Sequence, residues 1–255
     1  MIVNLIPMAG EGQRFKNAGY NTVKPLLDTD GIPMFVRAAR SLPPADLYIF
    51  VCRRDQVDQT IISSVIKSNF PASEIIYIDQ LTQGQAITCL KAESLIPENC
   101  ILNIGPSDSD MIFDQLEYDE FVRNPDKQSL IWTVTGDQSV LRNVNMYGWV
   151  LADRETRSVH KVSCKQPVSS NPSLDPAIIG CFSFKPAKLF FESVSRMIQE
   201  KDTINQEYYV DIAMNHLIAL GGSAHILNVE QYICWGTPAD YESYIHWLKY
   251  FKHAT

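Results

Sequence analysis

The amino-acid sequence predicts an α/β fold with a mixed, mostly parallel sheet flanked by helices. In the first half of the chain, short apolar runs alternate with amphipathic stretches, which is typical of strands and helices that follow one another. The 255 residues are 45% hydrophobic and 20% charged, as in ordinary globular proteins with a substantial core. No apolar run is long enough to span a bilayer, so no membrane partner is expected.

The first half is expected to contain five strands and three helices. The strands are short runs rich in aliphatic residues, at Ile2–Ile6, Leu47–Cys52, Ile75–Ile78, Cys100–Ile104 and Ser129–Thr135. Helical spacing predicts helices at Met34–Ser41, Val57–Asn69 and Gln85–Leu95. In the last of these helices, Ala86, Leu90 and Leu95 share one face.

From about residue 143 the pattern of apolar residues changes. Strands are expected at Tyr147–Leu151, Val159–Val162, Ile178–Phe184 and Ile226–Val229. Helices are expected at Ala187–Glu200, Tyr209–Leu220 and Tyr241–Phe251. No repeat or linker separates the two parts, so we predict a single domain over residues 1–255, made of two interwoven halves at 1–142 and 143–255.

Charge and cysteine usage limit the possible partners and compartment. A net charge of −7 argues against nonspecific nucleic-acid binding, which requires an excess of clustered Lys and Arg. The six cysteines are scattered, without CxxC pairs or a zinc-type Cys/His set, and are expected to be reduced structural thiols. Residues 1–6 lack the basic segment of a signal peptide. A reducing, cytoplasmic location is therefore expected.

A glycine loop, Gly10-Glu11-Gly12-Gln13-Arg14, directly follows the first predicted strand. In such sheets ligands bind at the carboxyl ends of the strands, and glycines let backbone N–H groups approach phosphates closely. The loop lacks the third glycine of a dinucleotide fingerprint and the GK[ST] end of a Walker A motif. Arg14 and the downstream Lys24 could bind phosphate as a fork and a point charge. A glycine turn with two surface cations is the alternative interpretation.

The stretch IPMAGEGQRFKNAGYNTVKPLLDTDGIPM resembles the N-terminal motif of the sugar-phosphate nucleotidyltransferase family. The resemblance continues in order at Gln83-Gly84-Gln85-Ala86, Asp108, Asn145–Val150, Lys165-Gln166-Pro167, Glu207–Asp211 and Trp235–Asp240. It implies a Rossmann-like, GT-A-like fold with a nucleotide-binding half at 1–142 and an acceptor-binding half at 143–255. The implied activity is transfer of a nucleoside monophosphate from an NTP to a phosphorylated acceptor, foremost a sugar 1-phosphate, with release of pyrophosphate. Sugar nucleotide and polysaccharide biosynthesis would be its context.

The resemblance also implies roles for individual residues. The nucleotide would be bound by Ala9, Gly10, Gly12, Arg14, Lys24, Gln83 and Gly84, and the acceptor by Tyr147, Gly148, Lys165 and Glu207. Arg14 would hold the β- and γ-phosphates, Lys24 the α-phosphate and Lys165 the acceptor's phosphate. Mg²⁺ would bind Asp108, with Asp110 as a second candidate ligand. Arg14, Lys24, Asp108 and Lys165 would be catalytic through positioning and charge neutralisation alone, since a phosphate monoester is already a nucleophile.

Two departures from the family pattern leave the acceptor and the metal ligands open. Cys164 stands where many relatives have an acidic residue that binds sugar hydroxyls. Cys234 and Trp235 stand where many have a second metal aspartate, so Asp110, Asp211 or water could complete the coordination. These departures leave the identity of the acceptor, including whether it is a sugar, undecided.

Two other functions remain possible on this sequence. The first is a glycosyltransferase that uses a nucleotide sugar through the D-x-D pair Asp108 and Asp110, and the second is a regulatory nucleotide-binding module without activity. The cations Arg14 and Lys24 favour nucleotidyl transfer over glycosyl transfer, because only the former needs a cradle for leaving pyrophosphate. No catalytic role is assigned to four histidines that show no ligand spacing: His160, His216, His225 and His246. The aromatic residues after Cys234 are expected in the core or in a subunit interface, so a homo-oligomer is possible.

Overall fold

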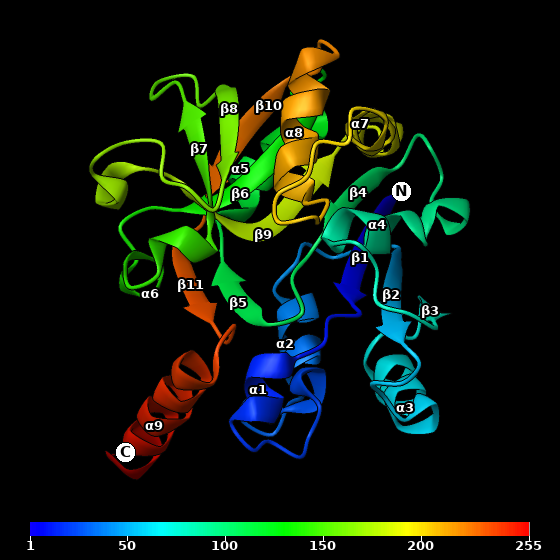
Figure 1. Ribbon diagram of the computed structural model, residues 1–255, viewed down its shortest axis with the longest axis vertical. Helices are drawn as coiled ribbons and strands as arrows, with labels where there is room; N and C mark the ends of the chain where they lie inside the picture. Colours follow the sequence, from blue (N-terminus) through cyan, green and yellow to red (C-terminus); the bar gives the residue numbers. More distant parts are fainter. Residues whose placement is uncertain (255) are drawn as a thin grey trace.

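The computed structural model describes residues 1–254 and contains a nine-stranded sheet with helices on both faces (Figure 1). The strands of this sheet are β1 (Ile2–Met8), β2 (Leu47–Arg53), β3 (Ser73–Ile78), β4 (Ile101–Ile104), β6 (Ser129–Val134), β7 (Gly148–Ala152), β8 (Val159–Cys164), β9 (Ala177–Phe184) and β10 (Ala224–Asn228). A separate two-stranded sheet pairs β5 (Ser109–Ile112) with β11 (Gln231–Cys234).

The described α-helices connect these strands or cover them. They are α1 (Gln13–Asn17), α2 (Met34–Arg40), α3 (Gln59–Asn69), α4 (Gln85–Leu90), α5 (Gln115–Arg123), α6 (Gln138–Leu141), α7 (Lys188–Gln199), α8 (Val210–Ala219) and α9 (Pro238–Ala254). Four short 3₁₀ helices are η1 (Lys24–Leu26), η2 (Glu93–Leu95), η3 (Val144–Met146) and η4 (Pro172–Leu174). Within residues 1–254, none of the helices is both long and apolar enough to cross a membrane.

The strand order of the large sheet is β10-β6-β9-β4-β1-β2-β3, with β7 on β9 and β8 on β7. Strands β3, β2, β1 and β4 are parallel neighbours, so their carboxyl ends meet at one edge of the sheet. Strand β9 runs antiparallel between β4 and β6, and thereby joins the second half of the chain to the first. The predicted mixed α/β sheet flanked by helices is confirmed.

Strand β1 is buried on both faces, as expected of a central strand between parallel neighbours. Its side chains alternate: Val3 and Leu5 join the cluster formed with α4, α7 and α8, whereas Ile6 and Met8 join the cluster formed with α2, α3 and α5. A third, smaller cluster of Phe15, Leu27, Met34, Trp235 and Tyr241 packs α9 against the N-terminal loop. All six cysteines are free thiols, as predicted.

One predicted helix is wrong in its extent, and several short elements were not predicted. The helix expected over Gln85–Leu95 ends at Leu90, where the amides of Lys91 and Ala92 bond three residues back, and η2 follows as a separate turn. Strands β5 and β11 have only four residues each and pair with each other in antiparallel orientation. Helix α5 was not predicted either; its N-terminus is capped by Asp114, whose side chain accepts a 2.8 Å hydrogen bond from the Leu116 amide.

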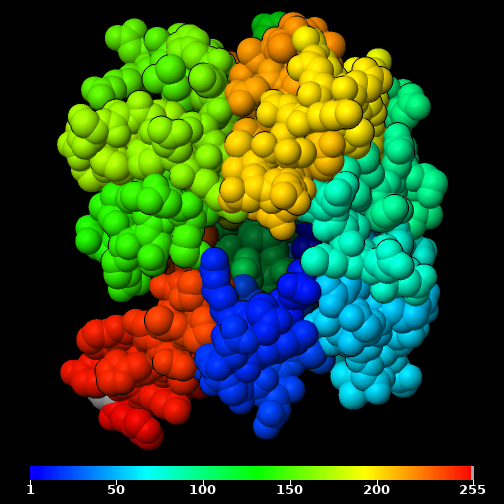
Figure 2. Space-filling view, viewed as in Figure 1, coloured from blue at the N-terminus to red at the C-terminus, as the bar shows by residue number. Residues whose placement is uncertain are grey.

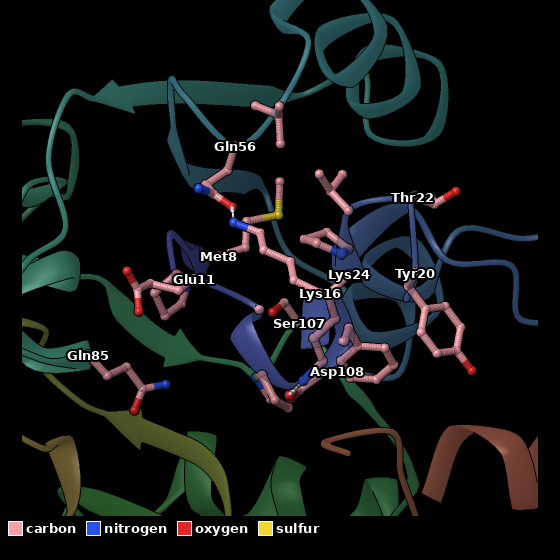
Figure 3. Close-up of a pocket in the computed structure, with 18 of the residues that line it drawn as sticks. Met8, Glu11, Lys16, Tyr20, Thr22, Lys24, Gln56, Gln85, Ser107 and Asp108 are labelled. Atoms are coloured by element: carbon pink, nitrogen blue, oxygen red, sulfur yellow. Dashed lines mark hydrogen bonds and ion pairs between the residues drawn. The ribbon is translucent and has the colours of Figure 1, made fainter. Parts of the chain in front are cut away.

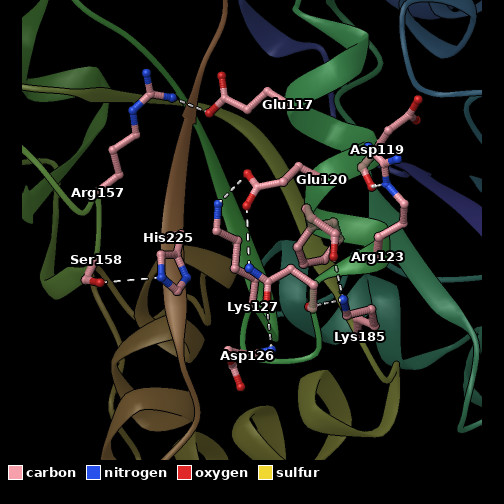
Figure 4. A network of polar contacts seen from close by, with 12 residues as sticks. Glu117, Asp119, Glu120, Arg123, Asp126, Lys127, Arg157, Ser158, Lys185 and His225 are labelled. Carbon is pink, nitrogen blue, oxygen red and sulfur yellow. Dashed lines mark hydrogen bonds and ion pairs between the residues drawn. The ribbon is translucent and has the colours of Figure 1, made fainter.

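A polar network at the far end of the sheet fixes α5 (Figure 4). Lys185 donates hydrogen bonds to carbonyl groups at the end of this helix, at 3.2 Å from Val122 and 2.6 Å from Asn124. These bonds satisfy carbonyls that have no partner within the helix. Glu120 of the same helix pairs with Lys127 at 2.7 Å, and Glu117 pairs with Arg157.

A second polar network lies inside the core and links four strands to α5. The Asn103 amide nitrogen is 2.9 Å from Asn4 Oδ1 and 3.0 Å from the Tyr118 hydroxyl, and Asn103 Oδ1 accepts a hydrogen bond of 2.7 Å from Ser183. Ser183 in turn accepts a hydrogen bond from the Trp132 indole at 2.9 Å. All hydrogen-bonding atoms of the Asn103 side chain are therefore paired, as a buried amide requires.

Replacing Asn103 by Leu should lower the free energy of unfolding by about 3 kcal/mol, because the buried polar groups of Asn4, Tyr118 and Ser183 each lose a partner. Urea denaturation measures this change. The control is Asn171→Leu at an exposed site, which should stay within about 0.5 kcal/mol of the wild type. A loss below 1 kcal/mol for Asn103→Leu would show that the network contributes little to stability.

Candidate active site

Two adjoining cavities lie where the carboxyl ends of the parallel strands meet. The first has a volume of about 360 Å³ and the second of about 310 Å³. They share four lining residues: Lys24, Asp108, Ile179 and Gly180. Figure 2 shows a hollow at the centre of this face, between the N-terminal segment in blue and the yellow segment of the second half. The two cavities thus form one continuous site with a junction at Lys24 and Asp108.

The first cavity is built around the glycine loop that follows β1 (Figure 3). At Gly10, an added Cβ would meet no atom within 4 Å, so the backbone there faces open space. Gly12 has φ +60°, a conformation that glycine adopts without steric cost. Lys16 adds a second cation to this cavity beside Lys24 and donates a hydrogen bond of 2.8 Å to Gln56, which follows β2. Gln85, at the start of α4, lines the opposite wall.

An ion pair occupies the junction of the two cavities. Lys24 Nζ lies 2.5 Å from Asp108 Oδ2 and 3.2 Å from the Gly236 carbonyl oxygen, and it also stands 5.2 Å from the centre of the Phe15 ring. The Trp235 amide donates to the Asp108 carbonyl at 2.9 Å. Only 17% of the Lys24 side chain and 36% of the Asp108 side chain are exposed, so the pair is partly shielded from water. Segments from the start, the middle and the end of the chain meet here.

The second cavity contains Lys165, which is held by a chain of hydrogen bonds. Lys165 Nζ donates to the Tyr209 hydroxyl at 2.5 Å and lies 4.5 Å from the centre of the Tyr209 ring. The Tyr209 hydroxyl donates to Glu207, which therefore supports Lys165 through the tyrosine. Lys165 has φ +59°, an uncommon conformation for a residue with a side chain, and Pro167 follows two residues later. This arrangement directs a cation into the cavity from the end of β8.

A buried carboxyl group, Asp211, shares the wall with Lys165. It belongs to the first turn of α8 and is surrounded by protein atoms, yet part of its surface remains accessible from the cavity. Burial raises the pKa of Asp211 to about 6, although the charge of Lys165 opposes the shift. The neighbouring Cys164 has its pKa raised to about 12 by burial, so it remains a neutral thiol.

Two tyrosines and Cys234 close the second cavity on the side of β11. The Tyr147 hydroxyl donates to Cys234 Sγ at 3.5 Å, and the Gly236 amide donates to the same sulfur at 3.2 Å. Burial raises the pKa of Cys234, and it also raises the pKa values of Tyr147 and Tyr232. Cys234 is thus a protonated thiol in this arrangement, not a thiolate that would attract a metal ion.

Several solved structures have the same architecture as this chain and match it over nearly its whole length. A nucleoside-diphosphate-sugar pyrophosphorylase from Vibrio cholerae RC9 superposes with a TM-score of 0.76 at 19% identity, over 96% of this chain and 100% of that chain. A UDP-glucose pyrophosphorylase complexed with UDP-glucose gives 0.74 at 19% identity, over 98% and 99%. The inositol-1-phosphate CTP transferase from T. maritima gives 0.71 at 11% identity, over 95% and 93%. The chain has the nucleotidyltransferase fold. No protein-family model matches the chain, and no curated protein matches it in sequence.

Within this nucleotidyltransferase fold, most of the predicted site residues lie together. Gly10, Gly12 and Lys24 line the first cavity, and Arg14, Tyr147, Gly148 and Lys165 line the second, with Asp108 at the junction. Arg14 lines the second cavity and not the first, whereas the family resemblance implied a contact with the β- and γ-phosphates of the nucleotide. Ala9 is buried beneath the loop.

Asp110 is turned away from both cavities. Its Oδ2 lies 3.9 Å from Arg37 Nη1, and its Oδ1 accepts a hydrogen bond of 2.9 Å from the Met111 amide. Burial raises the pKa of Asp110, although Arg37 opposes the shift. The residue therefore serves the contact between β5 and α2, and the structure gives no support to its expected role as a metal ligand.

Gln83 and Gly84 contact the protein instead of lining the first cavity. The Tyr208 amide donates to the Gln83 carbonyl at 2.9 Å, and an added Cβ on Gly84 would lie 2.6 Å from the Tyr208 carbonyl oxygen. Gly84 also has φ +99°, so this close approach requires glycine. In the same motif, Gln85 lines the first cavity, although the sequence analysis assigned it no role.

Several further lining residues were not assigned to the site from the sequence. They are Lys16, Gln56, Ser107, Tyr209 and Tyr232. Tyr209 could have been predicted from the sequence, since it lies within the segment 207–211 that resembles the family pattern. Lys16 and Gln56 reach the cavity from elements whose relative placement only the folded chain defines.

The raised pKa of Asp211 predicts a pH-dependent cost in stability. A carboxyl group that protonates more easily in the folded than in the unfolded state destabilises the fold once it ionises. Asp211→Asn is neutral at every pH and should raise the free energy of unfolding at pH 7 by about 1–3 kcal/mol. The gain should vanish as the pH falls from 6 towards 4, where Asp211 is protonated in the folded protein. Urea denaturation between pH 4 and 7 tests this, and equal stability of both proteins at pH 7 would contradict it.

Proposed function

We propose that the protein is a nucleotidyltransferase that transfers a nucleoside monophosphate from an NTP to a small phosphorylated acceptor and releases pyrophosphate. The observation that carries the proposal is the pair of cavities that share Lys24 and Asp108. One cavity follows a glycine loop suited to phosphates, and the other presents the cation Lys165. The solved structures of the same fold are described as pyrophosphorylases and a CTP transferase, and a sugar 1-phosphate is accordingly the first acceptor to test.

The cations of the site would bring two polyanions together. Lys24 lines both cavities and can contact the α-phosphate, where the bond to the leaving pyrophosphate breaks. Arg14 and Lys165 would neutralise charge on the acceptor's side. Without cations, two phosphate groups a few Å apart would repel each other by several kcal/mol at a moderate effective dielectric. The acceptor's phosphate oxygen is already a nucleophile, so positioning and charge neutralisation suffice and no side chain needs to remove a proton.

A magnesium ion fits this site through Asp108. Residues 1–254 contain no group of three or more His, Cys, Asp or Glu residues that could hold a metal on their own. Mg²⁺ is commonly held by one or two carboxylates together with substrate phosphates, and Asp108 supplies one carboxylate at the junction. When bound, the ion would contribute charge stabilisation on the phosphates.

The position of Asp110 argues against glycosyl transfer through a D-x-D pair. Such a site needs both acidic groups at the nucleotide, but Asp110 faces Arg37 and lines neither cavity. We also infer a cytoplasmic location, which the six free thiols support. Pathways that make sugar nucleotides for polysaccharides would be the context of the reaction.

Release of pyrophosphate tests the proposed function. The protein should release pyrophosphate when it is given Mg²⁺, one of the four NTPs and one member of a panel of phosphorylated acceptors, starting with sugar 1-phosphates. NTP binding without pyrophosphate release from any pair would instead identify a regulatory binding module. Transfer of sugar from a nucleotide sugar, with release of the nucleoside diphosphate, would identify a glycosyltransferase.

Lys165 should act on the acceptor and leave the nucleotide almost untouched. Lys165→Ala is expected to raise the acceptor KM or lower kcat, while the NTP affinity measured by calorimetry stays within about threefold, because Lys165 lines only the second cavity. Lys161→Ala, at an exposed position of the preceding strand β8, serves as the control and should leave both constants unchanged. Loss of NTP binding in Lys165→Ala, with acceptor binding intact, would place Lys165 in the wrong half of the site.

A further inference from the structure

The wall of the second cavity offers the acceptor one ionisable carboxyl group besides Asp108. Asp108 lines both cavities and pairs with Lys24, whereas Asp211 lines only the second cavity. The charged neighbour of Asp211 is Lys165, whose ammonium group is also hydrogen-bonded to Tyr209. Asp211 therefore lies beside the cation that is proposed to receive the acceptor's phosphate.

The backbone opposite Asp211 leaves room for this carboxyl group. An added Cβ on Gly148 would lie 2.1 Å from Asp211 Oδ2 and 3.0 Å from its Cγ. No side chain could stand at position 148 unless the carboxyl group moved. Glycine at the first residue of β7 therefore lets the Asp211 carboxyl group keep its present position.

Other side chains on this part of the wall are poor hydrogen-bond acceptors. Cys164 is a thiol, which accepts and donates weakly. Ile178 and Met146 are apolar, and the Tyr209 hydroxyl already bonds to Lys165 and Glu207. A polar group of the acceptor that enters this region would find its strong acceptor in the Asp211 carboxylate.

We propose that Asp211 is the specificity-determining residue of the acceptor cavity. Its carboxylate accepts a hydrogen bond from a donor group that the acceptor carries in addition to its phosphate. This inference rests on the proposed function, because that reaction defines the acceptor. The donor is a hydroxyl group, as in a sugar phosphate, or an ammonium group, as in a phosphorylated amino alcohol. Lys165 then binds the phosphate, and Asp211 distinguishes an acceptor that carries the donor from one that lacks it.

The position explains why a partly desolvated carboxylate is present at all. A carboxyl group enclosed by protein with little hydrogen bonding disfavours the folded state when ionised. A bound donor would supply the missing partner, and strained or unpaired groups of this kind are frequent at functional sites. The alternative role of Asp211 as a metal ligand predicts a different response to substitution, which the experiment separates.

Calorimetric binding of three probes to the wild type and to Asp211→Asn tests the proposal without requiring turnover. The probes are inorganic phosphate, which lacks the second group, glucose 1-phosphate and phosphoethanolamine. The variant should bind at least one of the two esters about 10- to 100-fold more weakly, as expected for the loss of a hydrogen bond to a charged group, and bind inorganic phosphate as the wild type does. The ester with the larger loss identifies the donor as hydroxyl or ammonium. Asp202→Asn is the matched control, because the Asp202 carboxylate contacts His216 of α8, the helix that contains Asp211.

Three results would overturn the proposal. One is equal binding of both esters by the wild type and Asp211→Asn, and another is a wild type that binds neither ester more tightly than inorganic phosphate. The third is a raised Mg²⁺ requirement for NTP binding in the variant, which would assign Asp211 to the metal. Thermal unfolding of each variant confirms that the fold is retained. If the Asp211-dependent binding is present but no pyrophosphate is released, the proposed reaction fails and the recognition role of Asp211 stands.

Discussion

The ion pair between Lys24 and Asp108 is the contact on which the architecture of the site depends. It joins η1 to the segment after β4, and through Gly236 and Trp235 it also holds the segment before α9. Because both cavities open onto this pair, a phosphate that binds Lys24 from the first cavity stands beside the second. Ligand phosphates and a metal ion would each replace one half of the ion pair, so the charges of the site are balanced before and after binding.

Much of the fold could be predicted from the sequence because the core is periodic. Strand β1 alternates its side chains between two apolar clusters, and the glycine loop follows it directly. Parallel neighbours then bring this loop, Gln56 after β2 and Asp108 after β4 to one edge of the sheet. The four-residue strands β5 and β11 could not be predicted in the same way, since each is defined by its partner from the other half of the chain. The direction of Asp110, which β5 positions, could not be predicted for the same reason.

The second cavity shows where a sequence motif and a folded site differ. The sequence raised the question of what replaces an acidic residue before Lys165, where this chain has Cys164. In the folded chain Asp211 lies near Cys164, although the two are separated by strand β9 and helix α7 in the chain. Gly148, which comes from a third segment, leaves the space that Asp211 needs. The spacing of Cys164, Asp211 and Gly148 along the chain does not predict that they meet, so their contact could be found only in the folded structure.

The most direct measurement is a crystal structure of the protein with Mg²⁺ and a non-hydrolysable NTP analogue. The account predicts the triphosphate in the first cavity along the glycine loop, with the α-phosphate at Lys24, the metal ion on Asp108 and the second cavity left free for the acceptor. A nucleotide bound in the second cavity, or one that leaves the Lys24–Asp108 ion pair intact, would contradict it.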